Sequence, residues 1–181
     1  MSAAESAVLT RHDGAVMTIQ LNRPEALNAL NAAMYTALGT ALIEAASTSV
    51  RAVVFTGSGR GFCPGQDLKD SASDDPAADL RLVDGTVRAL RALQKPTIAA
   101  INGSVAGGGL AYALACDIRI AASSAKFAPA FADLGLVPDL GCSWLLAQAM
   151  GASRAFEWLS SGGRTTASEA LAMGLVHEVV S

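Results

Sequence analysis

The stretch SVAGGGLAYALACD, residues 104–117, places three consecutive glycines directly before an apolar helical pattern. Glycine loses more conformational entropy on folding than other residues and is a poor helix former, so bare backbone must serve a purpose here. One interpretation is close packing of the helix against a strand. The other is that an N–H at the helix N-terminus binds a partly negative oxygen. The stretch alone favours neither.

A second glycine loop, FCPGQDL at residues 62–68, favours the second interpretation. Two such loops, each following a strand, could aim one N–H apiece at a single carbonyl oxygen. Such a pair of donors is an oxyanion hole, and the loss of one donor costs about 10²–10³ in rate. The nearby FTGSGRGF has neither the G-x-G-x-x-G spacing nor the G-K-[ST] ending of nucleotide-binding loops, so it predicts no nucleotide site.

Strand and helix patterns alternate along the rest of the chain. Residues 15–21 alternate apolar and polar side chains, 51–57 and 118–122 are short β-branched or apolar runs, and 143–150 and 153–160 have helical spacing. A strand, a loop and a helix recur in that order at least twice. The pattern predicts an α/β fold with parallel strand pairing, in one domain of residues 1–181.

Composition and charge exclude several classes of function. The net charge of −3 provides no basic surface for nucleic acid. The N-terminus has neither the basic nor the apolar region of an export signal. Residues 96–116 carry no charge, but their four glycines and Asn102 are typical of a buried, turn-rich segment rather than a membrane span. We therefore expect a soluble, cytoplasmic protein with no membrane or nucleic-acid partner.

The cysteines and histidines predict no metal site. Cys63, Cys116 and Cys142 are an odd number without metal-ligand spacing, which indicates free, buried thiols in a reducing compartment. His12 and His177 lie near the chain ends, far from any cysteine or acid cluster, so neither a histidine triad nor a metal centre is supported.

Five segments, in order and across nearly the whole chain, resemble the crotonase (enoyl-CoA hydratase/isomerase) superfamily. They are LNRPEALNALN, VVFTGSGRGFCPGQDL, INGSVAGGGLAYALACDIRIAASSAKFA, LGLVPDLG and ALAMGLVHEVV. The resemblance implies a ββα spiral that binds acyl-coenzyme A thioesters, with no cofactor beyond the coenzyme A moiety of the substrate. It also implies that the backbone N–H groups of Gln66 and Gly108 polarise the thioester carbonyl and stabilise an enolate.

The acids expected of a hydratase are missing. Hydratases of this family carry glutamates at two positions that are Ala111 and Phe131 here, and neither residue can transfer a proton. Asp139 remains. VPDLG is a good turn sequence, and Asp139 could also help cap a helix that begins near Ser143. The chain is most similar to the branch of ring-1,2-epoxyphenylacetyl-CoA and enoyl-CoA isomerases, in which an aspartate at this position shuttles a proton.

The surroundings of Asp139 favour that role. Val137, Pro138 and Leu140 flank it, and no lysine or arginine lies within ten residues on either side. A desolvated carboxylate without a cationic partner has a raised pKa, as a base acting on a carbon acid requires. Related dehalogenases use an aspartate here as a nucleophile but also need a histidine base, and none occurs between residues 13 and 176.

The resemblance also implies where coenzyme A binds. Its 3′-phosphoadenosine end is expected beside segments that match the nucleotide-contacting parts of the family, namely Arg23, Ala26, Leu27 and the backbone of Asp67 and Leu68. The oxyanion residues Gln66 and Gly108 complete the set expected to contact the acyl-coenzyme A, at its thioester. Arg23 could make a charge-assisted contact with phosphate, although an ordinary surface role is equally compatible with the sequence. Glu25, where relatives often have lysine, weakens the attraction.

Family members continue beyond the position of Ser181 into C-terminal helices that cover the acyl pocket and build a trimer. We therefore expect the crotonase spiral without its usual C-terminal helices in this chain, and a homotrimer or hexamer for a full-length protein. Two alternatives to an isomerase stay open: a non-catalytic acyl-CoA-binding protein that keeps the oxyanion loops, and a fragment with only a structural role.

Overall fold

The computed structural model describes residues 6–69 and 76–181, and the larger of its two sheets has six strands. They lie in the order β1-β2-β3-β5-β7-β10, and every pair is parallel except β1–β2. The strands are β1 (Val8–Asp13), β2 (Val16–Leu21), β3 (Ala52–Gly57), β5 (Thr97–Ile101), β7 (Ile118–Ala122) and β10 (Glu178–Val180).

A second sheet is built from very short strands. It has the order β4-β6-β8-β9, with parallel β4–β6 and β6–β8 pairs and an antiparallel β8–β9 pair. The strands are β4 (Gly61–Cys63), β6 (Ser104–Ala106), β8 (Lys126–Ala128) and β9 (Thr165–Thr166). Because β4 and β6 are parallel neighbours, the loops that follow them leave the same edge of this sheet.

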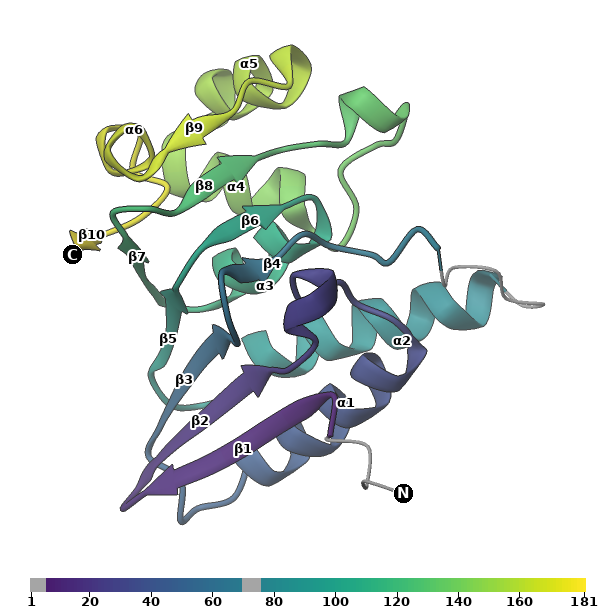
Figure 1. Ribbon diagram of the computed structural model, residues 1–181, viewed down its shortest axis with the longest axis vertical. Coiled ribbons are helices and arrows are strands. Elements are labelled where there is room, and N and C mark those ends of the chain that lie inside the picture. The colour runs from purple at the N-terminus through teal and green to yellow at the C-terminus, as the bar shows by residue number, and fades with distance from the viewer. Residues whose placement is uncertain (1–5, 70–75) are drawn as a thin grey trace.

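The helices complete a repeating unit of long strand, short strand and helix. The helices are α1 (Ala32–Ala45), α2 (Pro76–Arg91), α3 (Gly108–Ala115), α4 (Cys142–Met150), α5 (Ala152–Ser161) and α6 (Ala167–Ala172), with short 3₁₀ turns η1 (Pro24–Ala26) and η2 (Ala132–Leu134). The units β3-β4-α2, β5-β6-α3 and β7-β8-α4 each add one strand to each sheet. In Figure 1 these turns climb from β1 and β2 at the bottom to α5 and α6 at the top. The predicted ββα spiral is confirmed.

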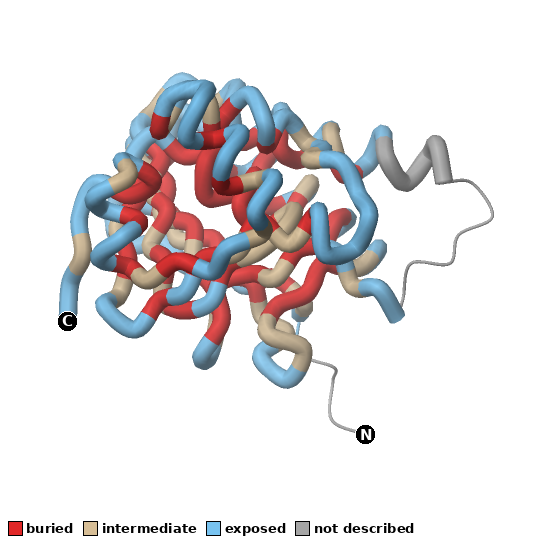
Figure 2. The backbone as a smooth tube through the Cα atoms, turned by 90° about the horizontal axis from the view of Figure 1, so that it is seen from above, coloured by how far each residue is buried: buried red, intermediate tan, exposed pale blue. Residues whose placement is uncertain are grey.

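The core follows from the alternation seen in the sequence. Met17, Ile19 and Leu21 of β2 are fully buried, as their spacing predicts. Asn31 begins α1 by accepting a hydrogen bond from the Met34 N–H at 3.1 Å, the usual role of asparagine at a helix N-cap. Figure 2 shows the buried inner segments of the chain enclosed by exposed outer turns.

Two parts of the fold differ from the sequence prediction. The sequence does not predict strand β1, because only Val8 of its six residues is buried and no apolar alternation marks the strand. The second sheet is not predicted either, because its strands have two or three residues, too few for a period to be recognised. Strand β4 also lies inside a segment that has the glycine-rich composition of a loop.

Two composition-based expectations can be compared with the structure. All three cysteines are buried and free. Across the described part of the chain, no helix combines the length and the apolar character needed to cross a membrane.

Candidate active site

The loops after β4 and β6 meet at one edge of the small sheet. Gly65 shows this most directly, because a Cβ atom on it would lie 2.8 Å from the backbone nitrogen of Gly108 and 3.3 Å from the carbonyl oxygen of Ala106. Gly65 also has φ of +98°, a conformation that L side chains rarely adopt. The two glycine loops singled out in the sequence are therefore in direct contact.

The triple glycine has a packing function. A Cβ on Gly109 would overlap the carbonyl oxygen of Cys63, and Gly107 has φ of +49° at the residue before α3. Helix α3 can approach the loop after β4 only because these positions lack side chains. Close packing, the first interpretation of the glycine run, is thus confirmed for Gly109. The N–H of Gly108 lies at the start of α3, where no intrahelical acceptor exists.

The peptide between Gly65 and Gln66 has a fixed orientation. The Gly65 carbonyl accepts from the Leu30 N–H at 2.8 Å, and the Asp67 N–H donates to the Leu30 carbonyl at 2.9 Å. In a trans peptide the C=O and the following N–H point in opposite directions, so the Gln66 N–H points away from Leu30. Within residues 6–69 and 76–181, neither this N–H nor that of Gly108 donates to a protein acceptor.

Side chains hold the same loop at two further points. The Tyr35 hydroxyl donates to Oε1 of Gln66 at 2.5 Å, and the Gly65 N–H donates to Sγ of Cys63 at 3.4 Å. Burial raises the pKa of the Cys63 thiol to about 12, so the sulfur is neutral. Neither Leu30 nor Tyr35 belongs to the predicted site residues. In the sequence both present only the apolar spacing of core residues, which contains no signal for these contacts.

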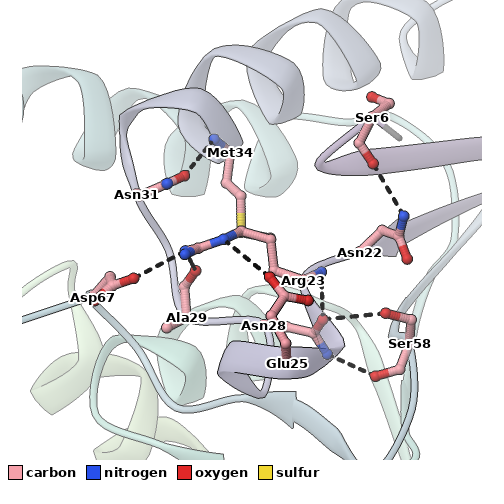
Figure 3. Close-up of polar contacts among 10 residues, drawn as sticks. All are labelled: Ser6, Asn22, Arg23, Glu25, Asn28, Ala29, Asn31, Met34, Ser58 and Asp67. Atoms are coloured by element: carbon pink, nitrogen blue, oxygen red, sulfur yellow. Dashed lines mark hydrogen bonds and ion pairs between the residues drawn. The ribbon is translucent and has the colours of Figure 1, made fainter. Parts of the chain in front are cut away.

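The segment predicted to contact coenzyme A is organised around Arg23 (Figure 3). Its Nη1 donates to Oδ2 of Asp67 at 3.0 Å and to the Ala29 carbonyl at 2.7 Å. The hydrogen bond from the Lys69 N–H, followed by the one from Arg23, lowers the pKa of Asp67. Buried Asn28 joins this segment to Ser58 and to the first residue of β4 by donating to the carbonyls of Ser58 and Gly61.

The other members of that predicted set lie nearby with less burial. Ala26 and Leu27, at the end of η1, are partly buried, whereas Leu68 is 60% exposed. A pocket of about 350 Å³ opens beside Arg23. It is lined by Ala7, Asn22, Arg23, Pro24, Glu25, Asn31 and Ala33. The structure thus brings Arg23 and Asp67 together as predicted, but Arg23 is already engaged by a carboxylate.

Asp139 lies in the loop between η2 and α4. Its carbonyl accepts from the Cys142 N–H at 2.7 Å, while the N-cap of α4 is Gly141 with no side-chain cap. The suggestion that Asp139 caps a helix beginning near Ser143 is therefore wrong. The adjacent Leu140 links this loop to the glycines, since its Cδ1 lies 3.4 Å from where a Cβ of Gly108 would be.

The environment of Asp139 is less enclosed than its flanking residues suggest. Asp139 itself is exposed, and so are Leu136 and Val137, although Phe131 is buried. Partial burial of the carboxyl group still raises the pKa of Asp139. Ala111 is fully buried in α3, so no acid occupies either position at which the family resemblance implies a hydratase glutamate.

The histidines take part in other contacts. His12 Nε2 lies 2.6 Å from a Glu44 carboxylate oxygen, and His177 Nδ1 accepts from the Arg119 N–H at 3.0 Å. In the portion of the chain that the structure describes, no cluster of His, Cys, Asp and Glu could hold a metal ion.

Comparison with known proteins adds to this geometry. The family model for enoyl-CoA hydratase/isomerase matches residues 11–181. The chain is 43% identical over 181 residues to the 1,2-epoxyphenylacetyl-CoA isomerase of Escherichia coli K12, covering 96% of this chain and 69% of that protein. It is 44% identical over 165 residues to a probable enoyl-CoA hydratase of Rhodobacter capsulatus, covering 90% and 64%.

The fold is matched by solved structures as well. The crystal structure of an enoyl-CoA hydratase from Bacillus anthracis has a TM-score of 0.91 at 34% identity, covering 96% of this chain and 70% of that one. The chain therefore spans about two thirds of the length of the curated relatives it matches.

Proposed function

Because the chain belongs to the enoyl-CoA hydratase/isomerase family, we propose that its protein is an acyl-CoA isomerase that moves a proton along an oxyanion-stabilised thioester. The observation that carries this proposal is the contact between the two glycine loops, with the Gln66 and Gly108 N–H groups lacking an acceptor in the described residues. The Asp139 loop joins them through Leu140.

The proposed reaction divides between backbone and side chain. The two N–H groups donate to the thioester carbonyl oxygen and stabilise the negative charge that develops on it. Asp139 takes a proton from a carbon of the acyl chain, leaving its electron pair in the enolate. It then returns the proton to another carbon, so that a double bond shifts. With an epoxide substrate, the enolate electron pair instead forms a new C=C bond as a C–O bond of the epoxide breaks, and the released oxygen takes the proton from Asp139. A single carboxylate is sufficient for such a transfer.

Isomerisation is favoured over hydration by the two apolar positions. Ala111 and Phe131 are buried and cannot place or activate a water molecule. Relatives carry both names, isomerase for the Escherichia coli protein and probable hydratase for the Rhodobacter capsulatus one. The alternative is a non-catalytic acyl-CoA-binding protein, which would need the same two loops but not Asp139.

Coenzyme A is proposed to bind along the Arg23–Asp67 side of the site. The pocket beside Arg23 and the nearby position of the Gln66 loop support this orientation. Glu25 and Asp67 both reduce the positive charge that Arg23 offers to a phosphate. Assembly of the full-length protein as a homotrimer or hexamer stays a prediction.

The variant Asp139→Asn tests the proposal because it keeps the shape and removes the base. We expect acyl-CoA binding by calorimetry to be unchanged, and deuterium exchange and double-bond migration to fall at least about 10²–10⁴-fold, the usual contribution of a general base. Asp133→Asn is the matched control, an exposed aspartate on η2 near the same loop. Exchange at the wild-type rate in Asp139→Asn would favour the non-catalytic binder.

The pH dependence provides a second readout. Because partial burial raises the pKa of Asp139 above the 3.8 of an unperturbed aspartate, kcat/KM should rise with pH and level off only above that raised value. Stability has the opposite sign. Because the pKa of Asp139 is higher in the folded protein than in the unfolded chain, its contribution to the free energy of unfolding is fully present below the unfolded pKa. That contribution is lost as pH rises through the folded pKa. Asp139→Asn should therefore be no less stable than wild type at pH 7.

A further inference from the structure

We propose that Tyr35 is a positioning residue for the oxyanion hole, and that its hydroxyl orients the backbone N–H of Gln66 by holding the Gln66 side chain. The inference rests on the proposed function, because it assigns Tyr35 to the polarisation of a thioester carbonyl. Tyr35 touches no reacting atom in this proposal and acts only through Gln66.

The Tyr35–Gln66 hydrogen bond joins a side chain packed in the core to an exposed side chain. Tyr35 is 3% exposed on α1, where it packs into the core, whereas Gln66 is exposed. The hydroxyl-to-Oε1 distance is 2.5 Å, at the short end for an O–H···O hydrogen bond. Ordering an exposed glutamine costs side-chain entropy, so the chain needs a specific partner to keep this residue in one position.

Backbone contacts constrain the neighbours of Gln66 but not its own polar atoms. Leu30 holds the Gly65 carbonyl and the Asp67 N–H, and the Cys63 sulfur holds the Gly65 N–H. Among the described residues, Tyr35 makes the one polar contact of Gln66. Leu30 sets the direction of the Gly65–Gln66 peptide through the Gly65 carbonyl, and Tyr35 adds an anchor at Gln66 on the other side of the N–H, so the two contacts together limit how far this N–H can tilt.

A purely structural role for Tyr35 predicts something different. A buried phenol needs a hydrogen-bond partner, and Gln66 could simply satisfy it. The chain contains a matched case in Tyr112, fully buried on α3, whose hydroxyl lies 2.5 Å from Thr86 Oγ1. Removing either hydroxyl leaves a buried phenylalanine, so the two changes have similar effects on packing but only one affects the Gln66 loop.

The experiment compares Tyr35→Phe with Tyr112→Phe in the full-length protein. The first readout is the carbonyl stretch of a bound acyl-CoA thioester by infrared difference spectroscopy, which reports polarisation without turnover. We expect Tyr35→Phe to lose part of the downshift and about tenfold in kcat with little change in KM, since misplacement within a site by about 1 Å costs up to about 10² in rate. Tyr112→Phe should keep the wild-type stretch.

A second variant tests whether Tyr35 acts through the side chain of Gln66. In a Gln66→Met background the acceptor is gone, so Tyr35→Phe should cause no further change in the stretch or in kcat. A wild-type stretch in Tyr35→Phe, or an undiminished effect in the Gln66→Met background, would overturn the inference. Absence of turnover in the wild type would count against the proposed isomerase, while the carbonyl stretch would still decide the role of Tyr35.

Discussion

The loop that carries Gln66 and the loop that carries Asp139 are held in different ways. Around Gln66, contacts come from Leu30, Tyr35 and the Cys63 sulfur, and Arg23 holds the adjacent Asp67. Residues 135–141 instead contain Leu136 and Val137 with 54% and 79% of their surface exposed. The same loop also contains Leu140 with φ of +52°, an uncommon conformation for leucine.

The contrast fits the two chemical tasks in the proposal. Donors that stabilise charge are effective when they are already oriented before the reaction, because no reorganisation is then needed. A base that removes a proton must reach a carbon on an acyl chain, and its loop carries the side chains that would meet that chain. In this proposal the fold therefore fixes the Gln66 and Gly108 amides through packing, whereas the Asp139 carboxylate lies on a loop with more exposed side chains.

The largest effect is expected when the fixed loop is distorted. Gly65→Ala would place a Cβ 2.8 Å from the Gly108 nitrogen and force a side chain into φ of +98°, so both amides must move. We expect kcat/KM to fall about 10²–10³-fold, as for the loss of an oxyanion donor. Steady-state kinetics on an acyl-CoA substrate would measure this fall.

Gly14→Ala is the control for backbone strain alone. Gly14 has φ of +56° in the β1–β2 turn, with no atom within 4 Å of the added Cβ. Its activity should equal that of wild type despite a modest loss of stability. Equal kinetics for Gly65→Ala and wild type would mean that the two glycine loops do not polarise the substrate.

The second prediction concerns how α3 is packed against the same loop. Gly109→Ala would bring its Cβ into the Cys63 carbonyl, so the helix must move away from β4. We expect a loss of about 2–3 kcal/mol in the free energy of unfolding, typical of overpacking and larger than the gain from replacing glycine in a helix. Urea denaturation would measure it.

Gly85→Ala on α2 separates packing from helix propensity. Gly85 is exposed, and no atom lies within 4 Å of an added Cβ, so this variant should gain about 0.5–1 kcal/mol. If Gly109→Ala were also stabilised, close packing would not explain why residue 109 is glycine. The requirement for bare backbone would then rest on Gly107 and Gly108.

The sequence was sufficient for most of the fold where a pattern spans a whole element. The alternation in β2 and the apolar spacing of α1 correspond to buried faces, as expected. The sequence does not indicate strand β1 because it buries one side chain of six, nor β6 because three residues have no recognisable period. Pairing with neighbours, not local pattern, determines these two strands.

The site was predictable only in part. Glycine runs indicated where two loops would need bare backbone, and Gly109 confirms the need through its approach to Cys63. The contact of Tyr35 with Gln66 joins residues 31 positions apart, and no local spacing indicates it. The exposure of Asp139 was likewise not predictable, because apolar neighbours in sequence need not be buried neighbours in space.

The smallest effect is expected at the outer end of the fixed loop, where Arg23 pairs with Asp67. The Lys69 N–H and Arg23 lower the pKa of Asp67 below 3.8, so this carboxylate stabilises the fold above its unfolded pKa. The contribution is lost as pH falls through the lower, folded pKa. Ion pairs near the surface contribute little because solvent and salt screen them.

Asp67→Asn should therefore lower the melting temperature slightly at pH 7, and the difference from wild type should shrink near about pH 3, below the usual aspartate pKa. The amide oxygen of the introduced side chain can still accept the hydrogen bond that Oδ1 takes from the Lys69 N–H, whereas the amino group in place of Oδ2 cannot accept from Arg23. The Leu30 contacts still hold the loop, so kcat should persist. Asp13→Asn, a change of the same chemistry at the exposed end of β1, is the control. A difference that persists or widens at low pH would mean that Asp67 acts through shape rather than charge. The hydrogen bonds of Asp67, rather than its charge, would then hold the Gln66 loop at this end, as the hydrogen bond from Tyr35 does at Gln66.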